Sequence, residues 1–119
     1  APVDVKLTEN DVVEPDLVFV AHSRRGIVTG RFIDGTPDLA VEVLSPSTQR
    51  TDLVQKRALY ARAGISEYWI ADVVRQQLHI HRLEAGVYVP IAEQKGIVAS
   101  LVLAGLEIDV ARLFAKIRR

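Results

Sequence analysis

The chain has 119 residues, of which 49% are hydrophobic and 25% are charged, as in an ordinary globular domain. It contains no cysteine, which excludes disulfides, thiolate nucleophiles and cysteine-ligated zinc. Fifteen basic and fifteen acidic residues give a formal net charge of zero, which argues against nucleic-acid binding through phosphate contacts alone.

Two features of the sequence bear on where the protein works. Its longest apolar run, 97–106, is interrupted by Ser100 and is far shorter than the ~20 residues that a membrane span needs. The N-terminus lacks the pattern of a signal peptide, so we expect a cytoplasmic protein that does not contact a membrane. Because the sequence has no methionine, we also expect a fragment whose natural start is missing.

The order of hydrophobic segments predicts a single α/β domain, 1–119, with a mixed sheet. Residues 22–35 are rich in Arg, Gly and Asp and are predicted as a loop, with a possible short strand at 27–28. In chain order, we predict strands at 12–13, 17–20 and 39–44, a helix from 52 to about 63, a strand at 67–71, a hairpin of 78–83 and 86–89, and a terminal helix over 110–117.

Glu42 stands in the middle of a nearly continuous apolar run, 39–44, which lies between Pro37 and Pro46. Such a run is typical of a central strand that is buried on both faces. A carboxylate in that position costs several kcal/mol unless it is paired, hydrogen-bonded or bound to a metal. Glu42 is therefore the first candidate for a functional residue.

Asp16 is the second carboxylate of this candidate site. If 16–21 and 38–44 form an antiparallel hairpin, Asp16 lies near Glu42, whereas Asp38 lies at the loop end of the hairpin. Adjacent carboxylates repel each other, and a hard divalent cation such as Mg²⁺ or Mn²⁺ relieves that repulsion. The alternative, in which Asp16 and Glu42 each pair with an Arg or Lys, remains open.

The predicted helix begins after Thr51, a good N-cap, and ends at Gly64. Asp52, Lys56 and Tyr60 follow one another at four-residue spacing and share one face of this helix. A helix returning over the sheet would aim Lys56 at the carboxylates, where it could orient an attacking water or neutralise charge on a phosphate. The alternative is an exposed Asp52–Lys56 pair that contributes only a few tenths of a kcal/mol.

From about residue 11 to the C-terminus, the sequence resembles the Uma-type restriction endonucleases, a family long known only as a domain of unknown function. The family is placed in the PD-(D/E)xK nuclease superfamily. The motifs that carry the resemblance are Pro15-Asp16, Pro37-Asp38-Leu39-Ala40-Val41-Glu42-Val43-Leu44-Ser45-Pro46-Ser47-Thr48, Asp52…Lys56…Tyr60, and Gly64-Ile65-Ser66-Glu67-Tyr68-Trp69-Ile70-Ala71-Asp72.

The resemblance implies a restriction-endonuclease-like core, a mixed β-sheet flanked by helices. It also implies that Asp16 and Glu42 are metal ligands and that the carbonyl of Val43 is a further one. The superfamily places a lysine two residues after the glutamate, but this chain has Leu44 there, and Lys56 is the expected replacement. Family members carry an additional N-terminal helical segment, which we expect this chain to lack.

Two functions are compatible with these residues. The first, which we favour, is a Mg²⁺-dependent (or Mn²⁺-dependent) endonuclease that hydrolyses phosphodiester bonds of nucleic acid, with DNA expected as the partner. Its catalytic residues would be Asp16, Glu42 and Lys56, supported by Tyr60 or Gln55, and cutting both strands suggests a homodimer. The second is a catalytically inactive nuclease-like fold that serves as a nucleic-acid-binding or protein-interaction module. The missing strand lysine and the neutral net charge favour this alternative.

Other polar residues are weaker candidates. We expect Asp38 to cap a turn and the two histidines of the predicted hairpin, His79 and His81, to lie on a solvated strand face. Three arginines of the 22–35 loop are predicted either as a phosphate-binding rim or as a solvated loop: Arg24, Arg25 and Arg31.

Overall fold

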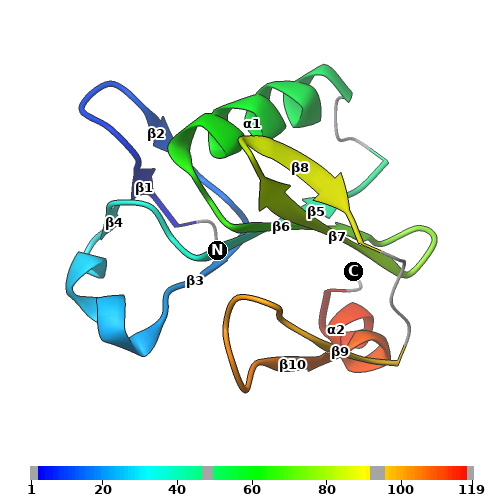
Figure 1. The fold of residues 1–119 in the computed structure, drawn as a ribbon. Coiled ribbons are helices and arrows are strands. Elements are labelled where there is room, and N and C mark those ends of the chain that lie inside the picture. The colour runs from blue at the N-terminus through cyan, green and yellow to red at the C-terminus, as the bar shows by residue number, and fades with distance from the viewer. Residues whose placement is uncertain (1–2, 47–49, 92–95, 118–119) are drawn as a thin grey trace.

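The computed structural model describes residues 3–46, 50–91 and 96–117 of the chain (Figure 1). Most of the elements expected from the sequence are present, with additional short strands. In chain order the elements are β1 (Val5–Lys6), β2 (Val12–Val13), β3 (Leu17–Phe19), the 3₁₀ helix η1 (His22–Ile27), β4 (Ile33–Asp34), β5 (Leu39–Leu44), α1 (Arg50–Ala63), β6 (Glu67–Asp72), β7 (Gln77–Glu84), β8 (Val87–Pro90), β9 (Ile97–Ala99), β10 (Glu107–Asp109) and α2 (Val110–Ile117).

The main sheet has five strands in the order β3-β5-β6-β7-β8. Strands β5 and β6 are parallel, because α1 connects them, and the other neighbours in this sheet are antiparallel. A parallel pair needs such a crossover connection, usually a helix. The predicted α/β fold with a mixed sheet is therefore confirmed.

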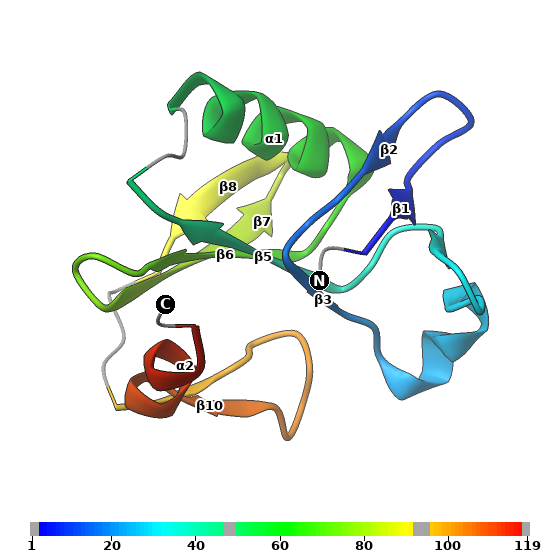
Figure 2. The ribbon, with the colours of Figure 1, turned by 180° about the vertical axis from the view of Figure 1, so that it is seen from behind.

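The main sheet lies between two layers. Figures 1 and 2 show α1 over one face, and β9, β10 and α2 against the other. Alternate residues of each strand point to opposite faces, so each layer packs on its own hydrophobic cluster. The cluster under α1 contains Ala40, Tyr60, Ile65, Tyr68 and Tyr88. The cluster facing α2 contains Leu39, Val41, Trp69, Ala71, Leu78, Ile80, Val98, Val110 and Phe114.

Helix α1 starts earlier than the sequence pattern predicts. It includes Arg50 and Thr51, so the prediction of Thr51 as N-cap is wrong. The predicted stop at Gly64 is confirmed: Gly64 has φ +83°, its amide bonds to the carbonyl of Ala61, and the amide of Ile65 bonds to the carbonyl of Tyr60. These two bonds form a Schellman motif, which satisfies the last carbonyls of the helix and fixes its final turn.

The short elements were not all predicted. The expected loop 22–35 contains η1 and β4, and its suggested strand at 27–28 is limited to an isolated bridge between Val28 and Ile33. Strand β4 joins β1 and β2 in a second sheet of order β2-β1-β4, while β9 and β10 form a two-stranded ribbon. Elements of two or three residues are too short to produce a readable hydrophobic period.

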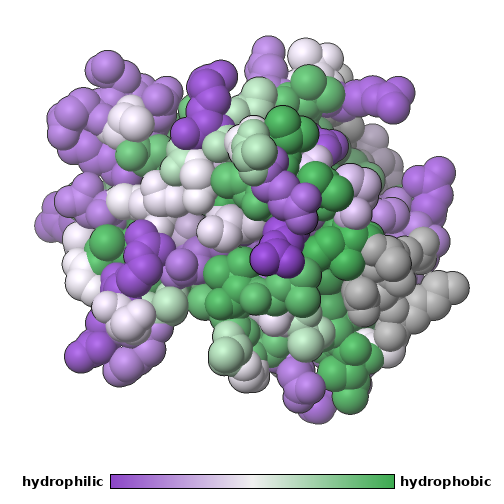
Figure 3. Space-filling view, viewed as in Figure 1, coloured by the Kyte–Doolittle hydropathy of each residue, from purple (hydrophilic) through white to green (hydrophobic). Residues whose placement is uncertain are grey.

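On the face seen in Figure 3, hydrophobic and hydrophilic residues are segregated. In the view of Figure 3, hydrophobic residues gather over the lower part of the molecule, where Figure 1 shows β9, β10 and α2. Ile97 and Leu101, at 66% and 57% exposure, are hydrophobic side chains of this C-terminal part that face solvent. Within the described ranges, no helix is long and apolar enough to cross a membrane.

Candidate active site

The register of β3 against β5 brings Asp16 next to Glu42. Leu17 pairs with Val41 and Phe19 pairs with Leu39 in this antiparallel pair. Continuing the same register by one residue places Asp16 directly opposite Glu42, where side chains of opposed residues lie on the same face. The antiparallel arrangement that the sequence predicted is confirmed.

Asp16 is held in place by a backbone contact across the two strands. Its Oδ2 accepts a hydrogen bond of 2.7 Å from the amide of Val43. The preceding residue, Pro15, is fully buried, and its carbonyl accepts a hydrogen bond from the amide of Val3, so the Asp16 side chain supplies the acceptor for the Val43 amide. Asp16 itself is half-buried. One carboxylate oxygen is thereby fixed at the edge of β5.

Glu42 is almost completely buried, with 3% of its surface exposed, and both of its oxygens have partners. Oε2 accepts a hydrogen bond of 2.5 Å from the hydroxyl of Tyr60, and Oε1 lies 3.3 Å from Nζ of Lys56. Both partners come from α1, which crosses the sheet above Glu42. The prediction that this helix brings Lys56 to Glu42 is confirmed, and Tyr60 is a second direct partner of Glu42.

Lys56 links two carboxylates. Besides Glu42, its Nζ lies 3.6 Å from Oδ2 of Asp52, one turn earlier on α1. Glu42 is almost fully buried in this arrangement, whereas the Asp52 side chain is half exposed. An exposed helix pair contributes little, so the contact with Glu42 is the one that defines the position of Lys56.

The pKa shifts of Glu42 and Lys56 agree with their contacts. Burial raises the pKa of Glu42 above its usual range, Tyr60 and Lys56 oppose that rise, and the negative charge of Asp16 adds to it. For Lys56, burial lowers the pKa, but the carboxylates, Glu42 first, raise it more, so that the net shift is upward. The charge of Asp16 therefore adds to the cost of ionising Glu42, and the lysine remains a cation.

A second acidic pair, which sequence reasoning missed, lies in the N-terminal hairpin. Val5 pairs with Val13, and continuing that register places Asp4 opposite Glu14. A hydrogen bond to Asp4 and repulsion from its charge raise the pKa of the exposed Glu14, while Lys56 opposes the rise. The charge of Lys56 thus acts on Glu14 as well as on Glu42. Only knowledge of the β1–β2 register would have revealed this pair.

Other predicted polar residues serve the fold. Asp38 lies at the opposite end of the β3–β5 pair from Asp16, where it accepts a 2.6 Å hydrogen bond from the amide of Ala21 and pairs with Arg24 at 3.0 Å. Arg24 also donates to the carbonyl of Thr36, so this arginine closes the loop. Asp38 therefore ties Ala21, the residue before η1, and Arg24 to the start of β5.

The two histidines differ from each other. His81 is buried, with Nδ1 3.2 Å from the carbonyl of Tyr68, so the prediction of a solvated position is wrong for this residue. It is covered because the tyrosine cluster under α1 extends to β7; its ring lies 5.9 Å from that of Tyr68. His79 is half-buried. Neither histidine is among the partners of Glu42.

A comparison with known families identifies the family of this chain. The family model described as "Uma2: Putative restriction endonuclease" matches residues 1–111, which include every residue of the site. The chain belongs to this family. None of the curated proteins matches the chain.

A solved structure supports the fold of this Uma2 family member. It is titled as a putative nuclease belonging to DUF820 from Anabaena variabilis ATCC 29413, with a TM-score of 0.65 and 18% sequence identity. The match covers 96% of this chain and 64% of that one, so the chain spans less than two thirds of the relative's length. The likeness concerns the fold.

The donor set of the Uma2 site fits a hard cation. No group of three or more His, Asp or Glu side chains that could hold a metal occurs in the part of the chain that the structure describes. Mg²⁺ commonly takes only one or two carboxylates and keeps several waters, and Asp16 and Glu42 supply two. Val43 can add a carbonyl, because the amide and carbonyl of a strand residue point to the same neighbour and its amide faces Asp16.

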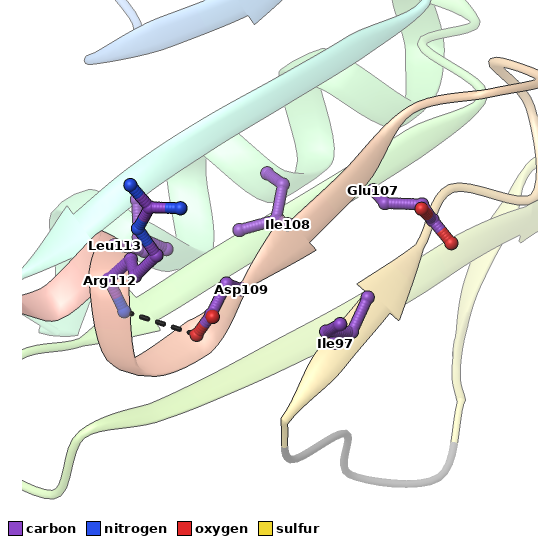
Figure 4. A pocket seen from close by; sticks show the side chains of 6 residues that line it. All are labelled: Ile97, Glu107, Ile108, Asp109, Arg112 and Leu113. Carbon is purple, nitrogen blue, oxygen red and sulfur yellow. Dashed lines mark hydrogen bonds between the residues drawn. The ribbon is translucent and has the colours of Figure 1, made fainter.

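A separate pocket of about 500 Å³ lies in the C-terminal part of the chain (Figure 4). Its lining residues come from β9, β10 and α2, and none of them is a predicted site residue: Ile97, Glu107, Ile108, Asp109, Arg112 and Leu113. These elements pack against the other face of the sheet from α1 (Figure 1). The carboxylate site and this pocket are therefore distinct.

Proposed function

We propose that this chain is a divalent-metal-dependent endonuclease domain that hydrolyses phosphodiester bonds of nucleic acid. The observation that carries the proposal is the buried Glu42, which lies beside Asp16 and 3.3 Å from Lys56, in a chain of a restriction-endonuclease family. Burying a carboxylate among apolar residues is costly, and buried carboxylates with perturbed pKa values cluster at functional sites.

The residues have separate roles in this proposal. Asp16 and Glu42 would hold Mg²⁺ or Mn²⁺, with the Val43 carbonyl as a third ligand. When bound, the cation supplies an activated water and polarises the phosphoryl oxygen. Lys56, whose Nζ contacts Glu42, would donate to the attacking water or to a phosphate oxygen whose negative charge grows during the reaction.

The position of Lys56 replaces the strand lysine that the superfamily pattern expects. Leu44, two residues after Glu42, cannot supply a cation, but α1 delivers an ammonium to the same carboxylate. A helix can do so because Lys56 and Tyr60, four residues apart, lie on one face. In the proposed enzyme, α1 would thus supply the cation that the superfamily pattern takes from the strand.

DNA is the substrate we favour, and a homodimer is the assembly we favour. Cutting both strands of a duplex is achieved most simply by two copies related by a two-fold axis. Sedimentation of the purified protein with and without a short duplex would measure the assembly. A monomer in both conditions would contradict this part of the proposal.

One observation favours a second candidate, an inactive nuclease-like fold that binds nucleic acid or protein. Both oxygens of Glu42 already have protein partners, Tyr60 and Lys56, so the carboxylate is satisfied without a cation. A site of this kind could persist for stability alone. Cleavage assays separate the two candidates.

The decisive experiment is cleavage of a supercoiled plasmid in Mg²⁺ or Mn²⁺, with EDTA as the metal-free control. We expect nicked or linear product with the original protein and none with Asp16→Asn or Glu42→Gln. Glu84→Gln, on the exposed end of β7, is a matched control that should retain activity. Binding of the plasmid without cleavage, unchanged in Glu42→Gln, would favour the inactive module. Parallel assays with single-stranded DNA and RNA would define the substrate.

A further inference from the structure

The two oxygens of Glu42 are held by very different groups. The Tyr60 hydroxyl donates to Oε2 at 2.5 Å, and Tyr60 is fully buried. Lys56 reaches Oε1 at 3.3 Å, and 30% of its side chain is exposed. A short, buried hydrogen bond to a carboxylate is among the stronger interactions in a protein, whereas a partly exposed ion pair is weaker.

Tyr60 is also held by its backbone and by its ring. The Schellman motif at the end of α1 uses its backbone carbonyl as acceptor for the amide of Ile65. Its ring packs edge-on against Tyr68, with ring centroids 5.4 Å apart and planes at 86°. Such an aromatic pair adds about 0.5–1.5 kcal/mol beyond its buried area. The hydroxyl of Tyr60 therefore has little freedom to move away from Glu42.

Lys56 is less restrained than Tyr60. Its ammonium ends a flexible four-carbon chain and is shared between Glu42 and the half-exposed Asp52. Turning toward Asp52 would leave Oε1 of Glu42 open while keeping the ammonium within the site. The oxygen that faces Lys56 is thus the exchangeable one, and the oxygen that faces Tyr60 is the fixed one.

We propose that Tyr60 is the positioning residue of this site: its hydroxyl fixes Oε2 of Glu42, so that Oε1 is presented to a divalent cation, which takes the place of Lys56. This inference rests on the proposed metal site. Groups that orient a metal ligand from behind typically change metal affinity by about 10- to 100-fold when they are removed. The lysine released from Oε1 is then available for the substrate.

The aromatic cluster provides a matched control. Tyr88 belongs to the same buried cluster, but its hydroxyl donates to the carbonyl of Ile65 at 2.7 Å and not to Glu42. Tyr60→Phe and Tyr88→Phe each remove one buried, hydrogen-bonded hydroxyl and keep the ring. A difference between them in metal binding reports the contact with Glu42, because each variant loses one buried hydroxyl of the same aromatic cluster and only Tyr60→Phe loses a bond to Glu42. Circular dichroism would verify that both variants fold.

The first measurement is calorimetric titration of Mn²⁺ into the full chain and its variants. We expect Tyr60→Phe to bind Mn²⁺ about 10- to 100-fold more weakly, Tyr88→Phe to bind within about twofold of the original, and Lys56→Met to bind more tightly. Equal or tighter binding by Tyr60→Phe would overturn the proposal. If Glu42→Gln abolishes binding while Tyr60→Phe does not, the metal site stands and the positioning role falls.

The second measurement needs no metal. In protein whose glutamate carboxyl carbons are labelled with ¹³C, the Glu42 signal should shift or broaden in Tyr60→Phe and remain unchanged in Tyr88→Phe. An unchanged signal in Tyr60→Phe would overturn the positioning role even if the metal site is real. If the original protein binds no Mn²⁺, the proposed metal site fails, and the carboxyl signal alone then decides whether Tyr60 positions Glu42.

Discussion

Lys56 lies 3.3 Å from Oε1 of Glu42, although the two residues are 14 positions apart and belong to different elements. For the proposed nuclease, Lys56→Met should reduce the rate of plasmid cleavage about 100-fold or more, the usual effect of removing a group that stabilises transition-state charge. Mn²⁺ binding should not weaken. Lys6→Met, which removes a surface lysine paired with Glu9, is the control and should cleave normally. Unchanged cleavage by Lys56→Met would contradict its catalytic role.

Glu67 secures the C-terminal elements to the sheet. It is fully buried at the start of β6, and it accepts hydrogen bonds from Trp69 Nε1 at 2.7 Å, Ser100 Oγ at 3.0 Å and the amide of Val102 at 2.6 Å. Glu67→Ala leaves Trp69 Nε1 and Ser100 Oγ without this acceptor, while the Val102 amide keeps only its 3.1 Å hydrogen bond to Ser100 Oγ. We expect the free energy of unfolding to fall by about 3 kcal/mol.

Urea denaturation would measure this loss, with the exposed Glu84→Ala as a control that should change stability by less than about 0.5 kcal/mol. The loss of stability in Glu67→Gln should lie between the losses in Glu67→Ala and Glu84→Ala. The glutamine amide keeps one acceptor oxygen, but its NH2 group faces donors in place of the second oxygen. A loss below about 1 kcal/mol in Glu67→Ala would show that water satisfies the donors and that the network does not stabilise the fold.

Much of the site could be predicted because it depends on local pattern. Glu42 is conspicuous as the one charge in an apolar strand, and period-two alternation together with the antiparallel register places Asp16 opposite it. Four-residue spacing places Lys56 and Tyr60 on one face of α1. Each step uses only neighbours on the same element or on the next strand, so the sequence determines the result.

What could not be predicted depends on distant contacts. Ser100 and Val102 meet Glu67 across more than 30 positions of sequence, and no spacing rule connects them. The burial of His81 follows from the packing of tyrosines from three elements. Asp4 and Glu14 come together only through the two-residue strands β1 and β2, which are too short to show a period.

His81 should make the stability of the fold depend on pH. Burial lowers the pKa of His81; the Tyr68 carbonyl opposes this shift, whereas the charges of Arg57 and His79 add to it. The folded state therefore favours the neutral ring. Unfolding takes up a proton once the pH drops below the ordinary value of 6.5, so the stabilisation is complete above that pH and is lost as the pH falls toward the folded-state pKa.

The test is the free energy of unfolding at pH 7.5 and pH 5.5. We expect the original protein to lose stability on acidification, with a slope due to His81 of at most about 1.4 kcal/mol per pH unit. His81→Gln should flatten the profile, and His79→Gln should preserve most of it. A profile that is identical in His81→Gln would assign the pH dependence to other groups.

Tyr68 carries the only buried side-chain polar atom without a hydrogen-bond partner in the described ranges, its hydroxyl oxygen. Its neighbour Tyr88 donates to the carbonyl of Ile65 at 2.7 Å, and the two rings lie 5.5 Å apart. An unsatisfied buried hydroxyl costs stability, and a satisfied one contributes about 1 kcal/mol. Tyr68→Phe should therefore be neutral or stabilising, whereas Tyr88→Phe should lower the free energy of unfolding by about 1 kcal/mol. Thermal and urea denaturation of the two variants would measure this difference, and an equal loss in both would mean that the Tyr68 hydroxyl finds a partner in solution.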